Sequence, residues 1–158
     1  MAAPLITILD ASNTSPIVNW DAGNIKAQVP TTPLEINIWN NKDGIADVSD
    51  LKEAEIMVLD DNGTTYESEV PQNKWVQVNN IGTDGDKTTF TAIGAEVTKK
   101  IRANGGVSTE YCIKGTANDG NPDNYPQNVA SAQLRLVAPM NSTPGDKSFK
   151  IRIVGYYT

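Results

Sequence analysis

The sequence predicts an all-β fold, a single immunoglobulin-like antiparallel β-sandwich domain that spans residues 1–158. Apolar residues alternate with polar ones in several short stretches, and turn residues separate these stretches at intervals typical of a sandwich or barrel. Helical patterning is poor, and no composition change marks a linker between domains. A chain of 158 residues is also the length of one ordinary domain, large enough for a self-sufficient core.

Period-two alternation is clearest in two stretches. In residues 34–39, Leu34, Ile36 and Ile38 share one face and polar side chains occupy the other. Residues 130–137 alternate in the same way, so both stretches are expected to be strands with one buried face. Further strands are expected at residues 5–9, 17–20, 55–59, 74–78, 88–93, 108–114 and 148–154.

Three segments are less regular. Residues 49–55 and 96–101 are each expected to form one helical turn, which is too short to be a stable helix by itself. Residues 1–16 are expected to form an N-terminal arm or an edge strand. None of these segments suggests a second domain.

Charge and hydropathy exclude two classes of partner. The chain has 19 acidic and 13 basic residues, a net charge of −6. A non-specific nucleic-acid binder needs clustered Lys and Arg to neutralise phosphates, so nucleic acid is not an expected partner. No apolar run approaches the roughly 18 residues of a membrane helix, so a membrane is not expected either.

The cysteine count and the first residues indicate where the protein is made. Cys112 is the single cysteine, so an internal disulfide is impossible. The opening residues lack a basic region and a long apolar run, so no signal peptide is expected. Both features fit synthesis in a reducing cytoplasm. Cys112 lies between Tyr111 and Ile113 in an apolar stretch, which is typical of a small buried hydrophobe rather than a reactive thiol.

The sequence carries little catalytic equipment. It contains no histidine, which excludes Ser-His-Asp and Cys-His arrangements and every zinc site built on imidazole. Nucleotide-binding glycine motifs and a nucleophile elbow are absent too. Glycosidase chemistry needs only a pair of carboxylates, but 19 acidic residues always supply some pair. The chain is therefore expected not to be an enzyme and to need no cofactor.

Residues 118–124 form the one cluster of hard oxygen ligands. Asp119, Asn121 and Asp123 are weak candidates for calcium, which takes six to eight oxygens. Their spacing departs from that of an EF-hand, and no bidentate glutamate closes the run. Turn formation is therefore the favoured interpretation. Residues 84–86 are a weaker second candidate of the same kind.

Aromatic residues suggest two kinds of surface. Trp20, Trp39 and Trp75 could line a sugar platform, although tryptophans in strand-like stretches more often pack in a core or subunit interface. Tyr156 and Tyr157 could form a docking patch at the C-terminal end, although aromatics at strand ends commonly cover the edge of a core.

Several stretches together resemble a group of small immunoglobulin-like proteins of tailed bacteriophages and prophages of Gram-positive bacteria. The most distinctive is a strand that ends in the corner Ile-Trp-Asn-Asn-Lys at residues 38–42. The resemblance covers residues 17–157, and its motifs are structural. The stretches that carry it are residues 36–44, 48–51, 56–59, 73–78, 89–94, 132–139, 143–146 and 149–154.

This resemblance implies a non-enzymatic part of the virion, either a capsid decoration protein or a tail or baseplate accessory. The expected partners are other virion proteins, which the chain would meet in many copies and with possible homo-oligomer formation. Assembly would take place in the cytoplasm of the bacterial host. The alternative is a carbohydrate-binding module that recognises a glycan of a bacterial cell surface. Head and tail locations both stay open.

A lattice contact of this kind would use exposed loops and edges. The candidates are Leu5 and Ile6 in the N-terminal arm, and Trp39, Asn40 and Asn41 in the corner that follows the strand at 34–39. Tyr156 and Tyr157 complete the set.

Overall fold

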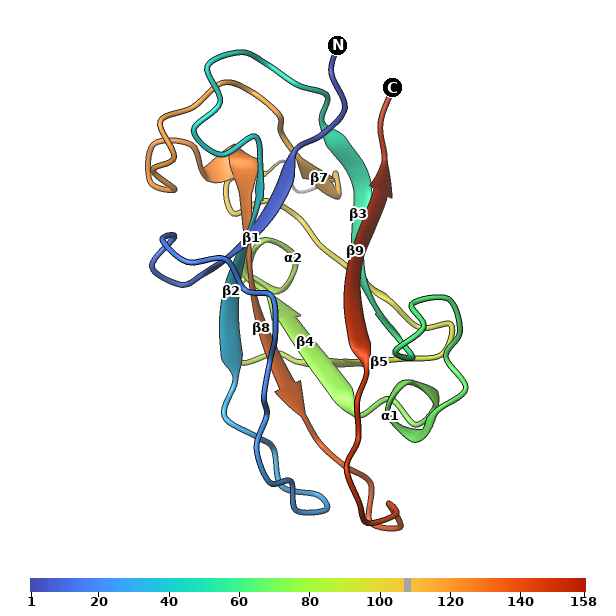
Figure 1. The fold of residues 1–158 in the computed structure, drawn as a ribbon. Helices are drawn as coiled ribbons and strands as arrows, with labels where there is room; N and C mark the ends of the chain where they lie inside the picture. The colour runs from blue at the N-terminus through green and yellow to red at the C-terminus, as the bar shows by residue number, and fades with distance from the viewer. Residues whose placement is uncertain (107–108) are drawn as a thin grey trace.

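The structure, a computed structural model, describes residues 1–106 and 109–158. Strands hold 33% of the chain and helices 7%, and every strand pair among the described residues is antiparallel, which confirms the all-β prediction. The strands form two sheets (Figure 1). The first has the order β1-β2-β8-β4-β5. Its strands are β1 (Ile6–Asp10), β2 (Leu34–Asn40), β8 (Val129–Leu136), β4 (Val76–Asn80) and β5 (Thr91–Ile93).

The second sheet is built around the long strand β3 (Leu51–Leu59). Strand β9 (Lys150–Tyr156) lines one edge of β3 from Leu59 back to Lys52. Because that edge is occupied, β6 (Lys99–Lys100) and β7 (Cys112–Ile113) pair with different parts of the opposite edge. In the part of the chain that the structure describes, three short helices lie in the connections. They are α1 (Glu69–Gln72), α2 (Ile81–Asp84) and the 3₁₀ turn η1 (Pro126–Asn128).

One hydrophobic core joins the two sheets. Alternate residues of β2 and β8 face it, and the register places Ile36 beside Ala132 and Ile38 beside Ala130. The other sheet supplies Ile56 among others. The fully buried members of the core are Ile38, Ala54, Ile56, Val58, Val70, Val76, Val78, Ile93, Ile101, Ile113, Ala130 and Leu136.

The two sides of this arrangement differ. On the β7 side, backbone hydrogen bonds link segments that adjoin the two sheets, from Lys114 N to Gln127 O (2.9 Å) and from Asn104 N to Val129 O (2.8 Å). On the opposite side, where β1 and β9 form the sheet edges, no backbone hydrogen bond among the described residues joins a strand of one sheet to a strand of the other. We call this the open side.

Residues 17–25, which we call the strap, partly cover the open side. The strap has no regular structure, and Ile17, Trp20, Ala22 and Ile25 pack against the core. In Figure 1 it is part of the blue coil that runs down beside β2. The strand expected at residues 17–20 is therefore wrong, because Ile17 N makes one bond to Ile8 O (3.0 Å) and the chain then leaves the sheet.

The helical turn expected at residues 49–55 is also wrong, because these residues enter β3. A β-bulge between Lys52 and Glu55 explains the misleading pattern. It adds one residue, Glu53, so that the inward-facing Leu51 and Ala54 stand three apart, which is the spacing of a helical face. Residues 96–101 likewise contain β6 rather than a helical turn.

The other expected strands were found with shifted bounds. The strand expected at 88–93 is shortened to β5, and the one at 108–114 is shortened to β7, with Ser108 outside the described residues. Of the N-terminal residues, 6–10 form the edge strand β1.

The bulge gives a test of backbone strain. Glu53 has a φ of +49°, a left-handed conformation that glycine adopts without the steric penalty of a Cβ atom. Its carboxylate also pairs with Lys100 (3.1 Å) at the surface. We expect Glu53→Gly to be more stable to urea than Glu53→Ala by about 1 kcal/mol, since both variants lose the ion pair and only alanine keeps the strain. Equal stabilities would contradict the assignment of strain to this residue.

Candidate binding surface on the open side

A groove of about 610 Å³ lies between the two sheets on the open side. Its floor includes inward-facing residues of the first sheet, and the strap and the beginning of β9 form its walls. Trp20 of the strap meets Phe149 edge to face, with ring centroids 5.8 Å apart. The apolar residues that line the groove are Ile8, Ile17, Val18, Trp20, Leu34, Ile36, Leu134, Phe149 and Ile151.

The two chain ends lie together at one end of the open side (Figure 1). Ser49 connects them, because its N–H donates to Ala2 O (2.8 Å) and its hydroxyl to Thr158 O (3.4 Å). The N–H of Leu5 donates to Asn40 Oδ1 (3.0 Å). Both ends are therefore fixed to the body of the domain.

Four of the sequence-predicted contact residues are exposed near these ends. Leu5 is 58% exposed, Tyr156 53% and Tyr157 54%, and Ile6 is exposed to a smaller extent. The pairing of Tyr156 with Lys52 of β3 places its side chain on the outer face of the second sheet. The structure thus presents these four apolar side chains to solvent, and their role as contacts stays a prediction.

Trp39, Asn40 and Asn41 were also predicted to contact a partner, and for them the prediction is wrong because all three are buried. Trp39 packs with Leu9 and Val129 on the outer face of the first sheet, under the loop that follows β1. Its indole N–H donates to Asn13 Oδ1 (2.7 Å). The tryptophan therefore fixes this loop to the sheet.

The two asparagines tie the sheets together. Asn40 Nδ2 donates to Ser49 O (3.0 Å) and Ile113 O (3.1 Å), next to and within the second sheet. Asn41 Nδ2 donates to Ala46 O (2.8 Å) and Gly115 O (2.9 Å). Buried carbonyls need such donors, so these amides stabilise the corner rather than bind a partner.

The calcium candidates form a chain of turns. Asp119 Oδ1 accepts from Asn121 N (2.9 Å) and its Oδ2 accepts from Asn124 Nδ2 (2.7 Å), and these bonds lower the pKa of Asp119, the backbone bond most. Asn121 Oδ1 accepts from Asp123 N (2.9 Å). Within the described residues, no group of three or more acidic or cysteine side chains converges as metal ligands would. The geometry is that of turn formation, the interpretation favoured by the sequence.

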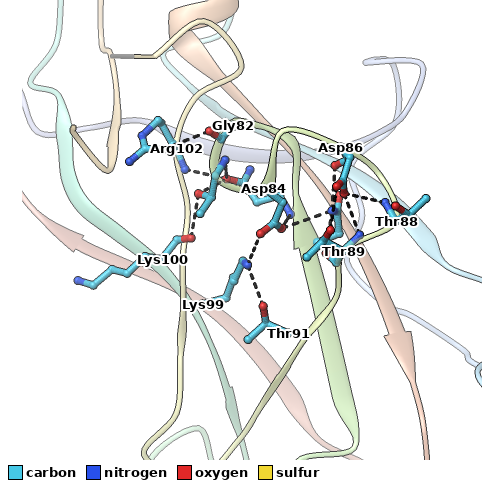
Figure 2. A network of polar contacts seen from close by, with 12 residues as sticks. Gly82, Asp84, Asp86, Thr88, Thr89, Thr91, Lys99, Lys100 and Arg102 are labelled. Carbon is cyan, nitrogen blue, oxygen red and sulfur yellow. Dashed lines mark hydrogen bonds and ion pairs between the residues drawn. The ribbon is translucent and has the colours of Figure 1, made fainter. Parts of the chain in front are cut away.

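The weaker candidate at residues 84–86 is occupied by protein groups (Figure 2). Lys99 Nζ lies 2.8 Å from Asp84 Oδ1 and 2.9 Å from Thr91 Oγ1, and both ionic side chains are less than a tenth exposed. Asp86 accepts hydrogen bonds from Thr88 N and Thr89 N. The network fixes the loop between β4 and β5 against β6 of the other sheet.

A second cleft, of about 490 Å³, contains several carboxylates beside α1. Hydrogen bonds from Ser68 and Thr65 hold the pKa of Asp60 well below its usual range. Bonds from Thr143 and Lys147 lower the pKa of Glu69 to about 2. A general acid needs the opposite shift of its pKa, so these two carboxylates serve as hydrogen-bond acceptors, Asp60 just after β3 and Glu69 at the start of α1.

Cys112 is buried beside β3, and burial raises the pKa of its thiol. A raised pKa keeps the thiol protonated and poorly nucleophilic. The structure therefore agrees with the interpretation of Cys112 as a small buried hydrophobe.

The three tryptophans do not form a common platform. Trp39 and Trp75 are buried, and Trp20 is partly exposed in the groove. Sequence reasoning missed several exposed apolar residues, among them Ile45 in the loop after β2 and Val18 in the strap. For Ile45 the sequence does carry a signal, because this isoleucine lies between Gly44 and Ala46, outside any alternating stretch.

Among the described residues, no helix is long and apolar enough to cross a membrane. Comparisons with models of protein families, with curated proteins and with solved structures find no match to this chain.

The burial of Trp39 leads to a test of its role. We expect Trp39→Ala to lower the free energy of unfolding by roughly 3–5 kcal/mol, because it removes a buried aromatic ring. Tyr157→Ala, a matched change of an exposed aromatic, should alter that free energy by less than about 0.5 kcal/mol. Denaturant unfolding followed by circular dichroism measures both values. A Trp39→Ala variant as stable as the wild type would restore the surface interpretation.

The lowered pKa of Asp60 predicts a dependence of stability on pH. A carboxylate with a depressed folded-state pKa stabilises the fold above its unfolded pKa, near 3.8, and the contribution is lost as the pH falls through the folded value. We therefore expect Asp60→Asn to be less stable than the wild type at neutral pH and to lose less stability on acidification below about pH 4.

Urea unfolding at several pH values checks the Asp60 prediction. Asp123→Asn is the matched control, since it makes the same charge change at an exposed loop position. Parallel pH profiles for Asp60→Asn and the wild type would contradict the role of this carboxylate.

Proposed function

We propose that this chain is a non-enzymatic structural protein of a tailed-phage particle, which decorates the capsid or forms part of the tail or baseplate. We also propose that its two sheets follow an immunoglobulin-like plan. The sequence resemblance described above supports both statements, and the paired antiparallel sheets with one shared core fit them. Assembly in the host cytoplasm is part of the same proposal.

The observation that most supports this role is the open side. Apolar side chains of the N-terminal arm and of the C-terminal strand are exposed around the chain ends, at one end of this side, on backbone that is fixed by hydrogen bonds to the body of the domain. A rigid apolar edge can bind a neighbouring subunit with little loss of conformational entropy. Repetition over a symmetric particle would multiply such contacts into firm attachment.

A second candidate is the recognition of a cell-surface glycan. The groove supports it, because Trp20 is partly exposed there beside the polar residues Asn19 and Ser148. The burial of Trp39 and Trp75 disfavours it, since neither is available to stack on a sugar ring. The particle role is therefore the better supported of the two.

Quantitative mass spectrometry of density-purified phage particles tests the proposal. We expect the chain to be present in purified particles, and its copy number relative to the major capsid protein assigns the location. Hundreds of copies per particle would indicate a capsid or tail-tube lattice, and tens or fewer would indicate the baseplate or fibres. Absence from intact particles would overturn the proposal, and binding of the purified protein to host cell-wall glycan would then support the second candidate.

A further inference from the structure

The outer edge of β9 is an unpaired strand edge. Strand β9 bonds to β3 along its other edge, and none of the described residues hydrogen-bonds to its outer backbone groups. Its inward-facing side chains Ile151 and Ile153 are only half-buried, because the domain is open on this side. An edge of this kind presents a row of donors and acceptors that a further strand can satisfy.

We propose that two copies of this chain associate through this edge, by antiparallel pairing of their β9 strands about a twofold axis midway between the two copies of Ile153. Twofold symmetry limits the choices strongly. An axis perpendicular to the sheet keeps each side chain on its own face, so one residue of the strand must lie directly opposite its own copy at the axis. Each choice of central residue then fixes which side chains lie opposite each other.

The charges of β9 select among these choices. Lys150 and Arg152 project from the outer face of the second sheet, since they pair with Leu59 and Met57 of β3. An axis at Ile151 would place Lys150 opposite the Arg152 of the other copy. An axis at Arg152 would place the two arginines opposite each other. Like charges directly opposite are destabilising, so both arrangements are disfavoured.

An axis at Ile153, the middle residue of the strand, avoids this repulsion. It places Arg152 opposite Val154 and Lys150 opposite Tyr156, where the ammonium group can lie against an aromatic ring. An axis at Val154 or Gly155 also avoids the repulsion, but it leaves Lys150 and Ile151 outside the paired region, whereas an axis at Ile153 pairs all seven residues of the strand. Ile153 meets its own counterpart, and the half-buried Ile151 lies opposite Gly155. The apolar inner face is thereby continued from one copy to the other.

The composition of β9 fits a second copy of the same chain. The strand carries two cations and no acidic residue, in a protein whose net charge is −6. Edge cations disfavour pairing with strands that would set a cation opposite them, which limits unspecific association. The antiparallel β9 strand of another copy places Val154 opposite Arg152 and Tyr156 opposite Lys150, so no cation faces another cation.

Sedimentation equilibrium of the purified full chain tests the association. For the wild type we expect a mass of twice 17.0 kDa that dissociates on dilution. Val154→Lys places a lysine opposite Arg152 of the other copy, and we expect it to abolish the dimer. Val154→Glu places a carboxylate there, and we expect it to retain or strengthen the dimer.

These two variants also separate association from folding. Within one chain, Val154 lies opposite Glu55 of β3. Val154→Lys therefore gains an intramolecular counter-ion, whereas Val154→Glu meets a like charge. The expected order of stability within a single chain is thus the reverse of the expected order of dimer formation. Thermal unfolding at low protein concentration, where dimers have dissociated, measures the order of stability within a single chain.

Cysteine cross-linking tests which residues of the two β9 strands lie opposite each other. With the axis at Ile153, the two Ile153→Cys residues face each other at a Cα separation of about 4.5–5.5 Å, within the range of a disulfide. We expect Ile153→Cys to form a covalent dimer on mild oxidation. Val154→Cys is the matched control, because it would face Arg152 and stay uncrosslinked. The native Cys112 is buried and does not compete.

Three results would overturn the inference. They are a wild-type chain that stays monomeric up to about millimolar concentration, a Val154→Lys variant that dimerises like the wild type, and cross-linking of Val154→Cys in place of Ile153→Cys. The inference does not depend on the particle role. A β9 dimer in solution would stand even if the chain proved absent from phage particles.

Discussion

On the β7 side of the domain, backbone hydrogen bonds from Asn104 N to Val129 O and from Lys114 N to Gln127 O link segments next to one sheet to β8 and to the turn before it. On the β1 and β9 side, no backbone bond among the described residues joins strands of the two sheets. There the sheets are held by side-chain packing and, near the chain ends, by the bond from Ser49 N to Ala2 O. The groove lies on this second side, where the strap, which has no regular structure, packs against the core and covers only part of the opening.

Side-chain amides supply hydrogen bonds between the two sheets where backbone hydrogen bonds are missing. Asn40 and Asn41 donate to carbonyls of the second sheet and its loops, and Asn13 accepts from Trp39 across the outer face of the first sheet. The buried pair of Lys99 and Asp84 joins the sheets at another point. A buried ion pair contributes little net stability but is strongly destabilising when one partner is lost. These polar contacts therefore specify one arrangement of the two sheets, and they add little to the free energy of unfolding.

Regular strands were predictable from the sequence because burial of one face imposes period two, as in residues 34–39 and 130–137. Irregular features were not, since the bulge at Glu53 imitates helical spacing and the strap is ordered only by tertiary contacts. The site was predicted in part. Leu5 and Tyr157 lie near the chain ends, where an exposed apolar residue can be recognised from the sequence. Trp39 was misassigned, because no local pattern shows that a distant loop covers it.

The single thiol of the chain has a further consequence. Cys112 belongs to a strand of only two residues, and its side chain is buried against β3. It is 9% exposed and lies on the outer face of the second sheet, since it pairs with Lys52. The packing around β7 limits the access of a thiol reagent, and the raised pKa keeps the reaction slow. The rate of labelling at Cys112 therefore reports local motion of β7 without an added probe.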